Sequence, residues 1–391
     1  MAALFKPSLR RTPESRSFIS LMRSMQIRSC GSGYVLDSSF RWNDGVAGLM
    51  RGFTIFAPLL MPLFTPLLIL AATIMVTSHA AAQTASTGSG QAYPTKPIRL
   101  IVGFPPGGSN DIVARIVSPR LGELLGVQVV VENRAGANAT IAADLVAKAA
   151  PDGYTVMLGS TSSLVISPHT YSKLPYDTLR DFAPVTTIAM TPEAVAVHPA
   201  LPVKDLKTLI ALAKTNPGKL DFASSGNGGL PHLAIELLKT MANINLQHVP
   251  FKGAGPAVTD LMGGHVQGMI MDFPAIYPQM QSGRLRGIAL AAEKRISLMP
   301  DLPTSGEQGM PGLLAVNWFA VVAPAKTPAA VITRLHTSLM KAIGGQDLKD
   351  RFAAVGVEPY TQNSPEAFAA FLKEELVRWG KVAKASGARA D

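Results

Sequence analysis

The stretch Ile98–Leu125, IRLIVGFPPGGSNDIVARIVSPRLGELL, decides the fold. It opens with the apolar, β-branched run Ile98–Phe104, which is typical of a buried strand, and continues through a turn rich in proline and glycine. From Ile112 to Leu125 apolar residues recur at helical spacing, and Gly126 follows as a helix stop. The order strand, turn, helix predicts the first part of a parallel βαβ unit.

The alternation of strands and helices continues along the chain. Strands are predicted at 127–131 and 155–159, with a helix at 141–149 between them, which is the order of parallel βαβ units. Further strands are predicted at 194–198, 220–223, 247–251, 268–271, 285–291 and 316–323. The later helices are predicted at 203–214, 231–241, 256–262, 328–343, 347–354 and 364–385. The pattern predicts an α/β protein with two lobes, each a mainly parallel sheet flanked by helices.

Composition excludes several classes of protein. Of 391 residues, 47% are hydrophobic and 16% are charged, which is too apolar for a disordered chain. The single cysteine, Cys30, excludes a disulfide framework and a multi-cysteine metal site. The net charge of +10 is uneven, because residues 1–82 hold eight Lys or Arg against three acids. No cluster of Lys and Arg follows Arg51, so we expect no nucleic-acid partner.

Residues 50–82 have the order of a secretory signal peptide. Arg51 precedes the uncharged run Phe53–Val76, and a small-residue Ala-x-Ala sequence ends at Ala82. A membrane-spanning helix is the alternative, which three prolines within the run disfavour. We therefore expect export to the periplasm, with residues 83–92 as a flexible tether. Whether the leader is cleaved or kept as an anchor stays open.

Residues 1–49 are basic, rich in serine and poor in acids. A start at Met50 would give a signal peptide of ordinary length. Our hypothesis is therefore that Met50 is the true initiator and that residues 1–49 are a mis-called extension. A long disordered leader that starts at Met1 is the alternative.

Two loops at the ends of predicted strands carry glycine and small hydroxyl residues but no basic side chain. Phe104–Asp111 and Phe222–Gly229 each lead into a predicted helix. Glycine lets the backbone turn tightly, and the N–H groups of a helix start favour an anion. A third loop, Gly159–Ser163, has the same character. Ordinary turns are the alternative in each case, and the glycine spacing fits neither a P-loop nor a dinucleotide-binding loop.

Sequence motifs for catalysis and metal binding are sparse. The histidines are scattered, no H-E-x-x-H or G-x-S-x-G sequence occurs, and no Cys/His/Asp cluster has ligand spacing. We therefore expect no catalytic residue, no metal and no cofactor. His232 lies in the first turn after the second loop, a position compatible with either a ligand contact or a structural role.

Several blocks, in their order, resemble the solute receptors of the tripartite tricarboxylate transporter family, the Bug receptors. They are YPTKPIRLIVGFPPGGSNDIVAR (93–115), AAPDGYT (149–155), DFASSGNG (221–228), HVPFKGAGP (248–256), LPT (302–304) and WFAVVAP (318–324). The resemblance implies a periplasmic binding protein of type II, in which two lobes joined by two crossing strands close on a small organic anion. We place the lobes at 93–190 plus 320–391 and at 191–319.

The resemblance also implies which residues bind the ligand. The loops matching 106–111 and 159–163 face its distal end, and those matching 224–228 and 250–253 hold a carboxylate through backbone and hydroxyl groups. Asp272 matches an acidic position at the cleft. The expected ligand-binding residues are Pro106, Gly107, Gly108, Ser109, Asn110, Asp111, Ser160, Thr161, Ser162, Ser224, Ser225, Gly226, Asn227, His232, Pro250, Lys252, Gly253 and Asp272.

The implied partners are a small organic carboxylate and the large and small membrane subunits of a tripartite transporter, with the receptor itself a monomer. A receptor that presents ligand to a sensor and an enzyme on the same two-lobed plan are the alternatives. The sequence departs from the family pattern at Gly229, where serine is common, at Gln267, and in Ala137–Thr140, which replaces a more glycine-rich run. The carboxylate therefore stays unidentified.

Overall fold

The βαβ pattern predicted from Ile98 onward is present in the computed structural model, which describes residues 93–391. The first elements are β1 (Ile98–Val102), α2 (Ser109–Leu125), β2 (Val129–Asn133), α3 (Thr140–Ala147) and β3 (Thr155–Ser160). β1 pairs in parallel with β2 on one side and with β3 on the other. Its apolar residues are buried, as the run Ile98–Phe104 predicts.

The predictions for the leader, at 1–49 and 50–82, and for the tether at 83–92 fall outside the described residues. Within residues 93–391, no helix is both long and apolar enough to cross a membrane.

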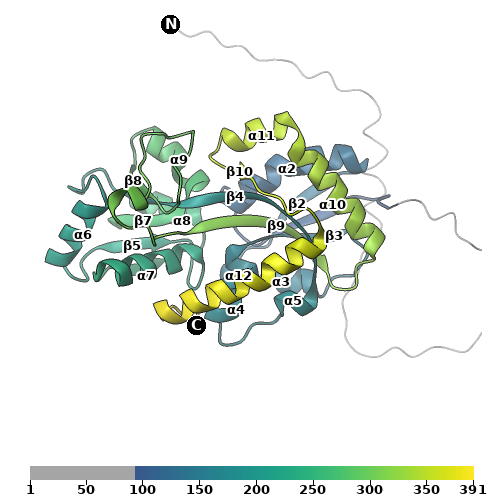
Figure 1. The fold of residues 1–391 in the computed structure, drawn as a ribbon, viewed down its shortest axis with the longest axis horizontal. Coiled ribbons are helices and arrows are strands. Elements are labelled where there is room, and N and C mark those ends of the chain that lie inside the picture. The colour runs from purple at the N-terminus through teal and green to yellow at the C-terminus, as the bar shows by residue number, and fades with distance from the viewer. Residues whose placement is uncertain (1–92) are drawn as a thin grey trace, which may run out of the picture. The chain divides into compact units, whose positions relative to one another are not determined.

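One long strand, β4 (Phe182–Val197), is shared by both lobes. Its first part pairs antiparallel with β9 (Val316–Pro324), and its end, from Glu193 onward, pairs antiparallel with β7 (Gly268–Asp272). Figure 1 shows β4 and β9 crossing the middle of the molecule between the two groups of helices. The lobe boundaries that we proposed, at 190/191 and 319/320, lie inside these two strands.

The sequence predicted only the end of β4, at 194–198. Pro184 and Pro192 lie within the strand and argue against it from sequence alone, since proline cannot donate to a sheet. In the structure, Pro184 stands at a register shift between β4 and β9, where the regular ladder is interrupted. Tertiary pairing with β9 therefore outweighs the local signal.

The sheet of the second lobe places β5 in parallel between β6 and β7, and β8 pairs antiparallel with β4. Its elements are α6 (Leu206–Thr215), β5 (Asp221–Ser224), α7 (Leu230–Ala242), β6 (Gln247–Pro250), α8 (Ala254–Met262), α9 (Phe273–Gln281) and β8 (Arg286–Leu290). We did not predict α9, because two prolines interrupt its sequence; Pro274 lies in the first turn, where its missing N–H costs nothing. The predicted two-lobed α/β class is confirmed.

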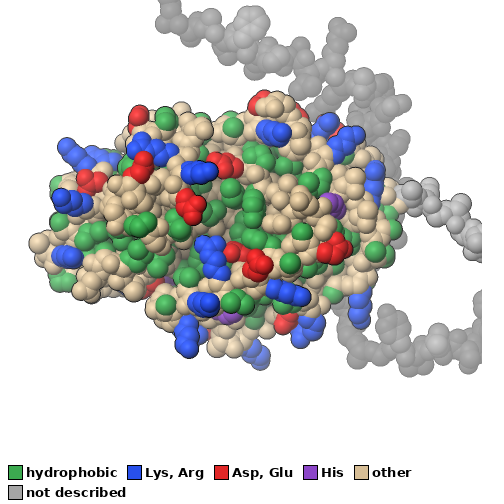
Figure 2. Space-filling model, viewed as in Figure 1, with side chains coloured by type: hydrophobic (Ala, Val, Ile, Leu, Met, Phe, Trp, Pro, Cys, Tyr) green, Lys and Arg blue, Asp and Glu red, His purple; other side chains and the backbone are tan. Residues whose placement is uncertain are grey.

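The other elements complete the first lobe and the connections. They are η2 (Ala137–Ala139), the π-helical turn η3 (Ser162–Ile166), α4 (Ser167–Thr170), α5 (Thr178–Asp181), η4 (Gly306–Gln308), α10 (Ala329–Gly344), α11 (Gln346–Ala353), β10 (Glu358–Pro359) and α12 (Pro365–Ser386). α12 packs on η3 and β4 and also on α7 of the second lobe. On the face drawn in Figure 2, basic and acidic side chains are interspersed.

A buried carboxylate fastens α12 to the crossing strands. Glu375 has 6% of its surface exposed and accepts the indole N–H groups of Trp318 on β9, at 2.9 Å, and of Trp379, at 3.0 Å. Arg378 forms an ion pair with the same side chain. The carboxylate thereby satisfies two indole donors that would otherwise be buried without a partner.

Removing this acceptor is expected to destabilise the protein. Glu375→Ala leaves two buried indole N–H groups unpaired, which should lower the free energy of unfolding by about 2–5 kcal/mol. Glu375→Gln keeps an acceptor oxygen and should cost less. Urea denaturation measures both, with the exposed neighbour Glu374→Ala as the control, expected to stay within about 0.5 kcal/mol of wild type. Equal stability of Glu375→Ala and the control would contradict the assignment.

Candidate ligand-binding site

Three helices start at the cleft with a glycine as the N-cap residue. Gly108 precedes α2, Gly229 precedes α7 and Gly253 precedes α8. Glycine has no side-chain oxygen to accept the first-turn N–H groups, so these donors are left for other partners. One of them, the N–H of Leu230, donates to Ser162 Oγ at 3.0 Å. The arrangement favours an anion in front of the helix starts.

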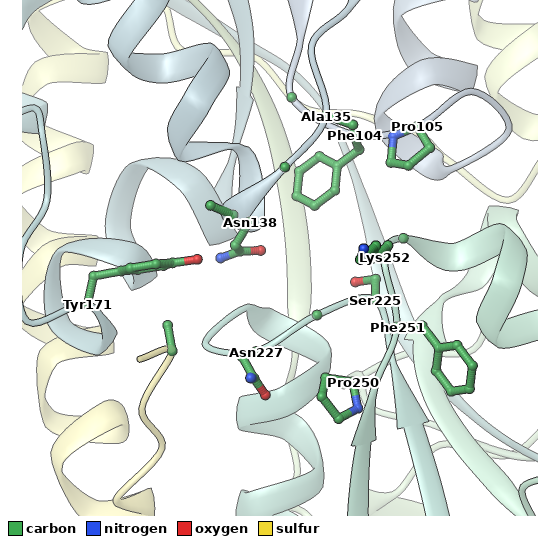
Figure 3. A pocket seen from close by; sticks show the side chains of 16 residues that line it. Phe104, Pro105, Ala135, Asn138, Tyr171, Ser225, Asn227, Pro250, Phe251 and Lys252 are labelled. Atoms are coloured by element: carbon green, nitrogen blue, oxygen red, sulfur yellow. The ribbon is translucent and has the colours of Figure 1, made fainter.

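A cavity of about 670 Å³ lies between these loops, and Figure 3 shows its lining. Six of the expected residues line it: Ser225, Gly226, Asn227, Pro250, Lys252 and Gly253. In Figure 3 Asn138 and Tyr171 stand on one side of the cavity, and Ser225 and Lys252 on the other. Phe104 and Pro105 complete the wall from the first lobe. The cavity is therefore built from both lobes.

A smaller pocket of about 20 Å³ adjoins the cavity and shares Phe104, Pro105 and Ser225 with it. Five more of the expected residues line this pocket: Gly108, Ser109, Asn110, Ser162 and Asp272. Ser109 Oγ, from the first lobe, donates a hydrogen bond to Asp272 Oδ2 in the second. This bond joins the two lobes at the cleft.

The remaining expected residues lie beside or behind the two pockets. Pro106 and Gly107 form an exposed turn. Thr161 Oγ1 accepts the N–H of Trp318, at 2.9 Å, and the N–H of Ser160 donates to Ser163 Oγ. These groups shape the loops. A direct ligand contact by any of them stays a prediction.

Asp111 braces the turn before α2. Its carboxylate accepts hydrogen bonds from the N–H of Gly107, from Arg115 and from Asn133. Burial alone would raise the pKa of Asp111, but the hydrogen bonds from Arg115, Gly107 and Asn133 hold it below the usual value. The ionised side chain therefore fixes the loop that carries Gly108, and its ligand contact stays a prediction.

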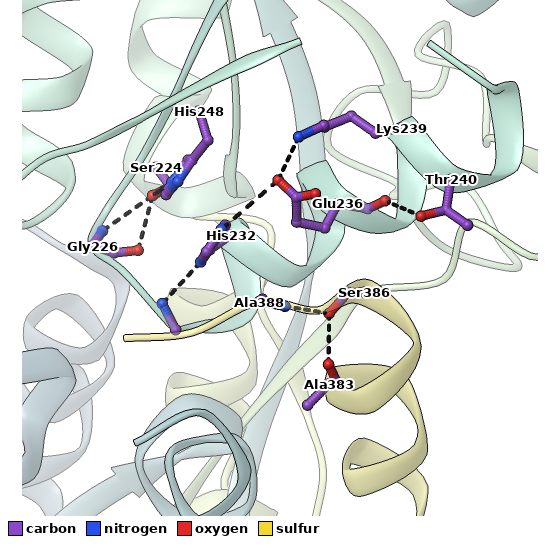
Figure 4. A network of polar contacts seen from close by, with 11 residues as sticks. Ser224, Gly226, His232, Glu236, Lys239, Thr240, His248, Ala383, Ser386 and Ala388 are labelled. Atoms are coloured by element: carbon purple, nitrogen blue, oxygen red, sulfur yellow. Dashed lines mark hydrogen bonds and ion pairs between the residues drawn. The ribbon is translucent and has the colours of Figure 1, made fainter. Parts of the chain in front are cut away.

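Two histidines support the second loop from behind, as Figure 4 shows. His232 Nδ1 accepts the N–H of Gly228 at 3.0 Å, and His248 Nε2 lies 2.6 Å from Ser224 Oγ. The two rings stack with centroids 3.8 Å apart. Burial, with the neighbouring His232 and Lys239, lowers the pKa of His248 to about 3, and burial lowers the pKa of His232. Both rings are therefore neutral at pH 7, which leaves His232 Nδ1 able to accept.

Several lining residues were not among those predicted to bind the ligand. They include Phe104, Pro105, Asn138, Tyr171, Phe251, Asn317 and Ala390. Phe104, Pro105 and Phe251 adjoin predicted loop residues, so their proximity in sequence could have indicated them. Tyr171 and Ala390 carry no sequence signal, because only the docking of α12 beside α4 brings them to the cavity.

Asn138 reaches the second lobe from a strained loop. Residues 137–139 all have positive φ angles, between 47° and 69°, although none is glycine. Asn138 Nδ2 donates to Ser167 Oγ at 3.0 Å and lies 3.4 Å from the carbonyl oxygen of Gly228. A Cβ added to Gly229 would stand only 2.6 Å from Asn138 Oδ1. The missing side chain at Gly229 therefore leaves the space that Asn138 uses.

A pair of carboxyl groups lies beneath the smaller pocket. Glu193 on β4 is opposite Asp272 on β7 and is fully buried. Neither oxygen of Glu193 accepts a hydrogen bond from any group in residues 93–391. Burial, and next the negative charge of Asp272, raise the pKa of Glu193 well above its usual range. Glu193 is thus neutral at pH values where an exposed glutamate is ionised, and its proton can bond to Asp272.

In the part of the chain that the structure describes, no three His, Cys, Asp or Glu side chains gather as a metal site would require. The expectation of no metal and no cofactor stays a prediction.

A family model for the tripartite tricarboxylate transporter family receptor matches residues 113–388. Among curated relatives, the protein BugT of Bordetella pertussis is 39% identical, over 79% of this chain and 95% of its own length. The UPF0065 protein of the tcbD-tcbE intergenic region in Pseudomonas sp. strain P51 is 40% identical, over 74% of this chain and 86% of its own length.

Solved structures show the same likeness over nearly all of their length. Rpa4515 of R. palustris, with adipate, has a TM-score of 0.74 and 36% identity, and covers 76% of this chain and 99% of its own. MatC of Rhodopseudomonas palustris, with bound malate, has a TM-score of 0.71 and 30% identity, and covers 74% of this chain and 99% of its own. A periplasmic binding protein, BugD, has a TM-score of 0.73 and 32% identity, with 76% and 99% covered.

Coupling between Gly229 and Asn138 is testable by a double-mutant cycle. Gly229→Ala should lower the free energy of unfolding by about 1–3 kcal/mol, because its Cβ crowds Asn138. Asn138→Ala removes the side chain that the new Cβ would crowd. The loss of unfolding free energy in the double variant should therefore be smaller than the sum of the two single losses by at least about 0.5 kcal/mol, measured by urea denaturation. Gly255→Ala is the matched control, since a Cβ there meets nothing within 4 Å. Additivity at both glycines would contradict the contact.

The raised pKa of Glu193 predicts a pH-dependent effect of Glu193→Gln. Below the ordinary glutamate pKa of 4.5, the carboxyl group is protonated in both the folded and the unfolded chain, so it does not change the stability with pH. As the pH rises, the unfolded chain releases the proton first, and wild type loses stability until the folded pKa is reached. Glu193→Gln has no proton to lose, so its unfolding midpoint should rise relative to wild type as the pH is raised from about 4.5 towards the folded pKa. The exposed Glu293→Gln is the control, and an unchanged difference across this range would refute the neutral state.

Proposed function

Because the chain belongs to the receptors of the tripartite tricarboxylate transporter family, we propose that it is an extracytoplasmic solute receptor that binds a small organic carboxylate between its lobes and delivers it to a tripartite membrane transporter. The observation that carries the proposal is that three helices, each with glycine as its N-cap residue and no side-chain cap, start at one cleft. Uncapped N–H groups can hold a carboxylate without an arginine.

The charge distribution at the cleft supports this way of holding the anion. Lys252 is the one basic residue among those lining the two pockets in the described part of the chain, and its side chain is exposed. Backbone N–H groups are fixed in place before the ligand arrives, so binding them costs little side-chain entropy. Adipate and malate, held by Rpa4515 and MatC, are both small dicarboxylates, which supports the same ligand class here.

Three contacts across the cleft support closure of the lobes over the ligand. Ser109 bonds to Asp272, Leu230 N–H to Ser162, and Thr170 Oγ1 to the carbonyl oxygen of Gly228 at 3.0 Å. A membrane subunit could then distinguish the closed receptor by the relative position of its lobes. We extend the proposal to a periplasmic monomer that is exported by residues 50–82 and partnered by one large and one small membrane subunit.

An enzyme on this plan is the weaker alternative, and the Ser224–His248 pair is the arrangement that could suggest one. Ser224 has no exposed surface, and its Oγ also donates to the carbonyl oxygen of Gly226. A histidine with a pKa of about 3 is a poor general base at neutral pH. These properties favour a structural role. A receptor that presents its ligand to a sensor would use the same site. Only the identity of the membrane partner would distinguish such a receptor from one that serves a transporter.

A thermal-shift screen of the mature chain against small carboxylates, adipate and malate included, tests the function. A ligand at about 100 times its dissociation constant should stabilise the fold by about 2.7 kcal/mol. Turnover of a stabilising ligand would favour the enzyme instead, and no stabilisation by any carboxylate would overturn the proposal.

Variants at Gly108 and Lys252 test how the anion is held. A Cβ at Gly108 makes only an ordinary contact, 3.7 Å from the carbonyl oxygen of Pro105, so Gly108→Ala should fold and bind. Gly108→Val adds methyl groups beside a pocket of about 20 Å³ and should abolish binding. Lys252→Ala should weaken binding by less than about tenfold in isothermal titration. Loss of binding in Lys252→Ala with retention in Gly108→Val would point to an ion pair instead.

A further inference from the structure

The smaller pocket is walled by buried polar side chains from four parts of the chain. Ser109 and Asn110 begin α2, Ser162 begins η3, Asp272 ends β7, and Asn317 belongs to β9. Each exposes 8% of its surface or less. Polar groups so far from water need hydrogen-bond partners, so their donors and acceptors can be balanced one by one.

One amide donor of Asn317 and the hydroxyl donor of Ser109 are used inside this group. Asn317 Nδ2 donates to Asp272 Oδ1 at 2.9 Å, and Ser109 Oγ donates to Asp272 Oδ2. The first bond fixes the orientation of the Asn317 amide, because an ionised carboxylate can only accept. Asn317 Oδ1 is therefore an acceptor, and no group in residues 93–391 donates to it. Asn110 Oδ1 is also buried without a donor from the described chain.

The charge at this end of the cleft is acidic. Neither Asp272 nor Glu193 forms a salt bridge with a Lys or Arg of residues 93–391. Lys252 lines the larger cavity rather than this pocket. Ala254, the first residue of α8, also lines the pocket, as do the first residues of α2. The pocket thus combines helix-start N–H donors with unpaired acceptors.

On the premise that the chain is a carboxylate receptor, we propose that the acceptors of Asp272, Asn317 and Asn110 form a subsite for a hydrogen-bond donor of the ligand, a hydroxyl or an ammonium group beside the carboxylate. A pocket of about 20 Å³ has room for one water-sized group, which fits either donor but not a second carboxylate. The ligand class is then hydroxy or amino carboxylates.

The two donors differ in how well they match the pocket. An ammonium group carries three N–H donors, enough for Asn317 Oδ1 and Asn110 Oδ1 together, and its positive charge is attracted by Asp272. A hydroxyl carries one donor and leaves one of these two acceptors unpaired. We therefore expect the amino carboxylate to bind most tightly, the hydroxy carboxylate next and the unsubstituted diacid least.

Two matched ligand series test the subsite by isothermal titration of the mature chain. Succinate, malate and aspartate differ only at one carbon, as do adipate, 2-hydroxyadipate and 2-aminoadipate. In at least one series the amino compound should bind about 10- to 100-fold more tightly than the unsubstituted diacid, the range that one charge-assisted hydrogen bond provides. In Asp272→Asn this preference should fall to less than about threefold, because the negative charge is gone.

Ser109→Ala is the matched control variant. It removes the hydroxyl that bonds to Asp272 across the cleft but leaves every acceptor in place, so it should weaken all compounds alike and keep their ranking. If the unsubstituted diacids bind most tightly, the pocket holds only water, and the subsite is overturned. The proposal of a carboxylate receptor would stay intact. A preference that persists in Asp272→Asn would overturn the subsite as well. Failure of all six compounds to bind would overturn the subsite, whereas the receptor itself is decided by the thermal-shift screen.

Discussion

The antiparallel pairing of β4 with β9 is the constraint on which the rest of the structure depends. β4 belongs to both sheets, so the two lobes share one strand and are held in a fixed order along it. The parallel strands of each lobe therefore end beside the same crossing, and the loops that follow them face each other across a cleft. α12 adds a second connection, because it packs on β4 and on α7, and Glu375 fastens it to Trp318 of β9.

The chemistry of the cleft follows from what caps its helices. At Gly108, Gly229 and Gly253 a serine or aspartate would satisfy the first-turn N–H groups from its own side chain, whereas glycine leaves them to other partners; at α7 one of them, the N–H of Leu230, is taken by Ser162. The fourth helix start, at α9, differs because its N-cap residue is Asp272, whose carboxylate is turned to Ser109 and Asn317. The cleft accordingly presents both donors and acceptors, which suits a ligand that carries both kinds of group.

Close approach between the lobes depends on the second loop having few side chains. Gly228 has a φ of 70°, and a Cβ there would also meet Thr170 and Ala390 at under 3 Å. Gly253 has a φ of 107°, and a Cβ there would stand 2.7 Å from Pro105. The neutral His232–His248 stack supports this loop from below, because His232 accepts the N–H of Gly228.

The sequence by itself determined the βαβ units, the glycine-rich loops and their place at the strand ends, because apolar periodicity and glycine are local signals. Together with the family resemblance, which alone indicated Pro250, Lys252, Gly253 and Asp272, it also indicated eleven of the residues that line the two pockets. Only the tertiary structure decided that β4 extends through Pro184 and Pro192, that Asn138 reaches Gly229, and that Glu193 and Asn317 lie beside Asp272. These features depend on pairing between segments far apart in the chain, whose energy outweighs local preference and leaves no pattern in any one stretch of sequence.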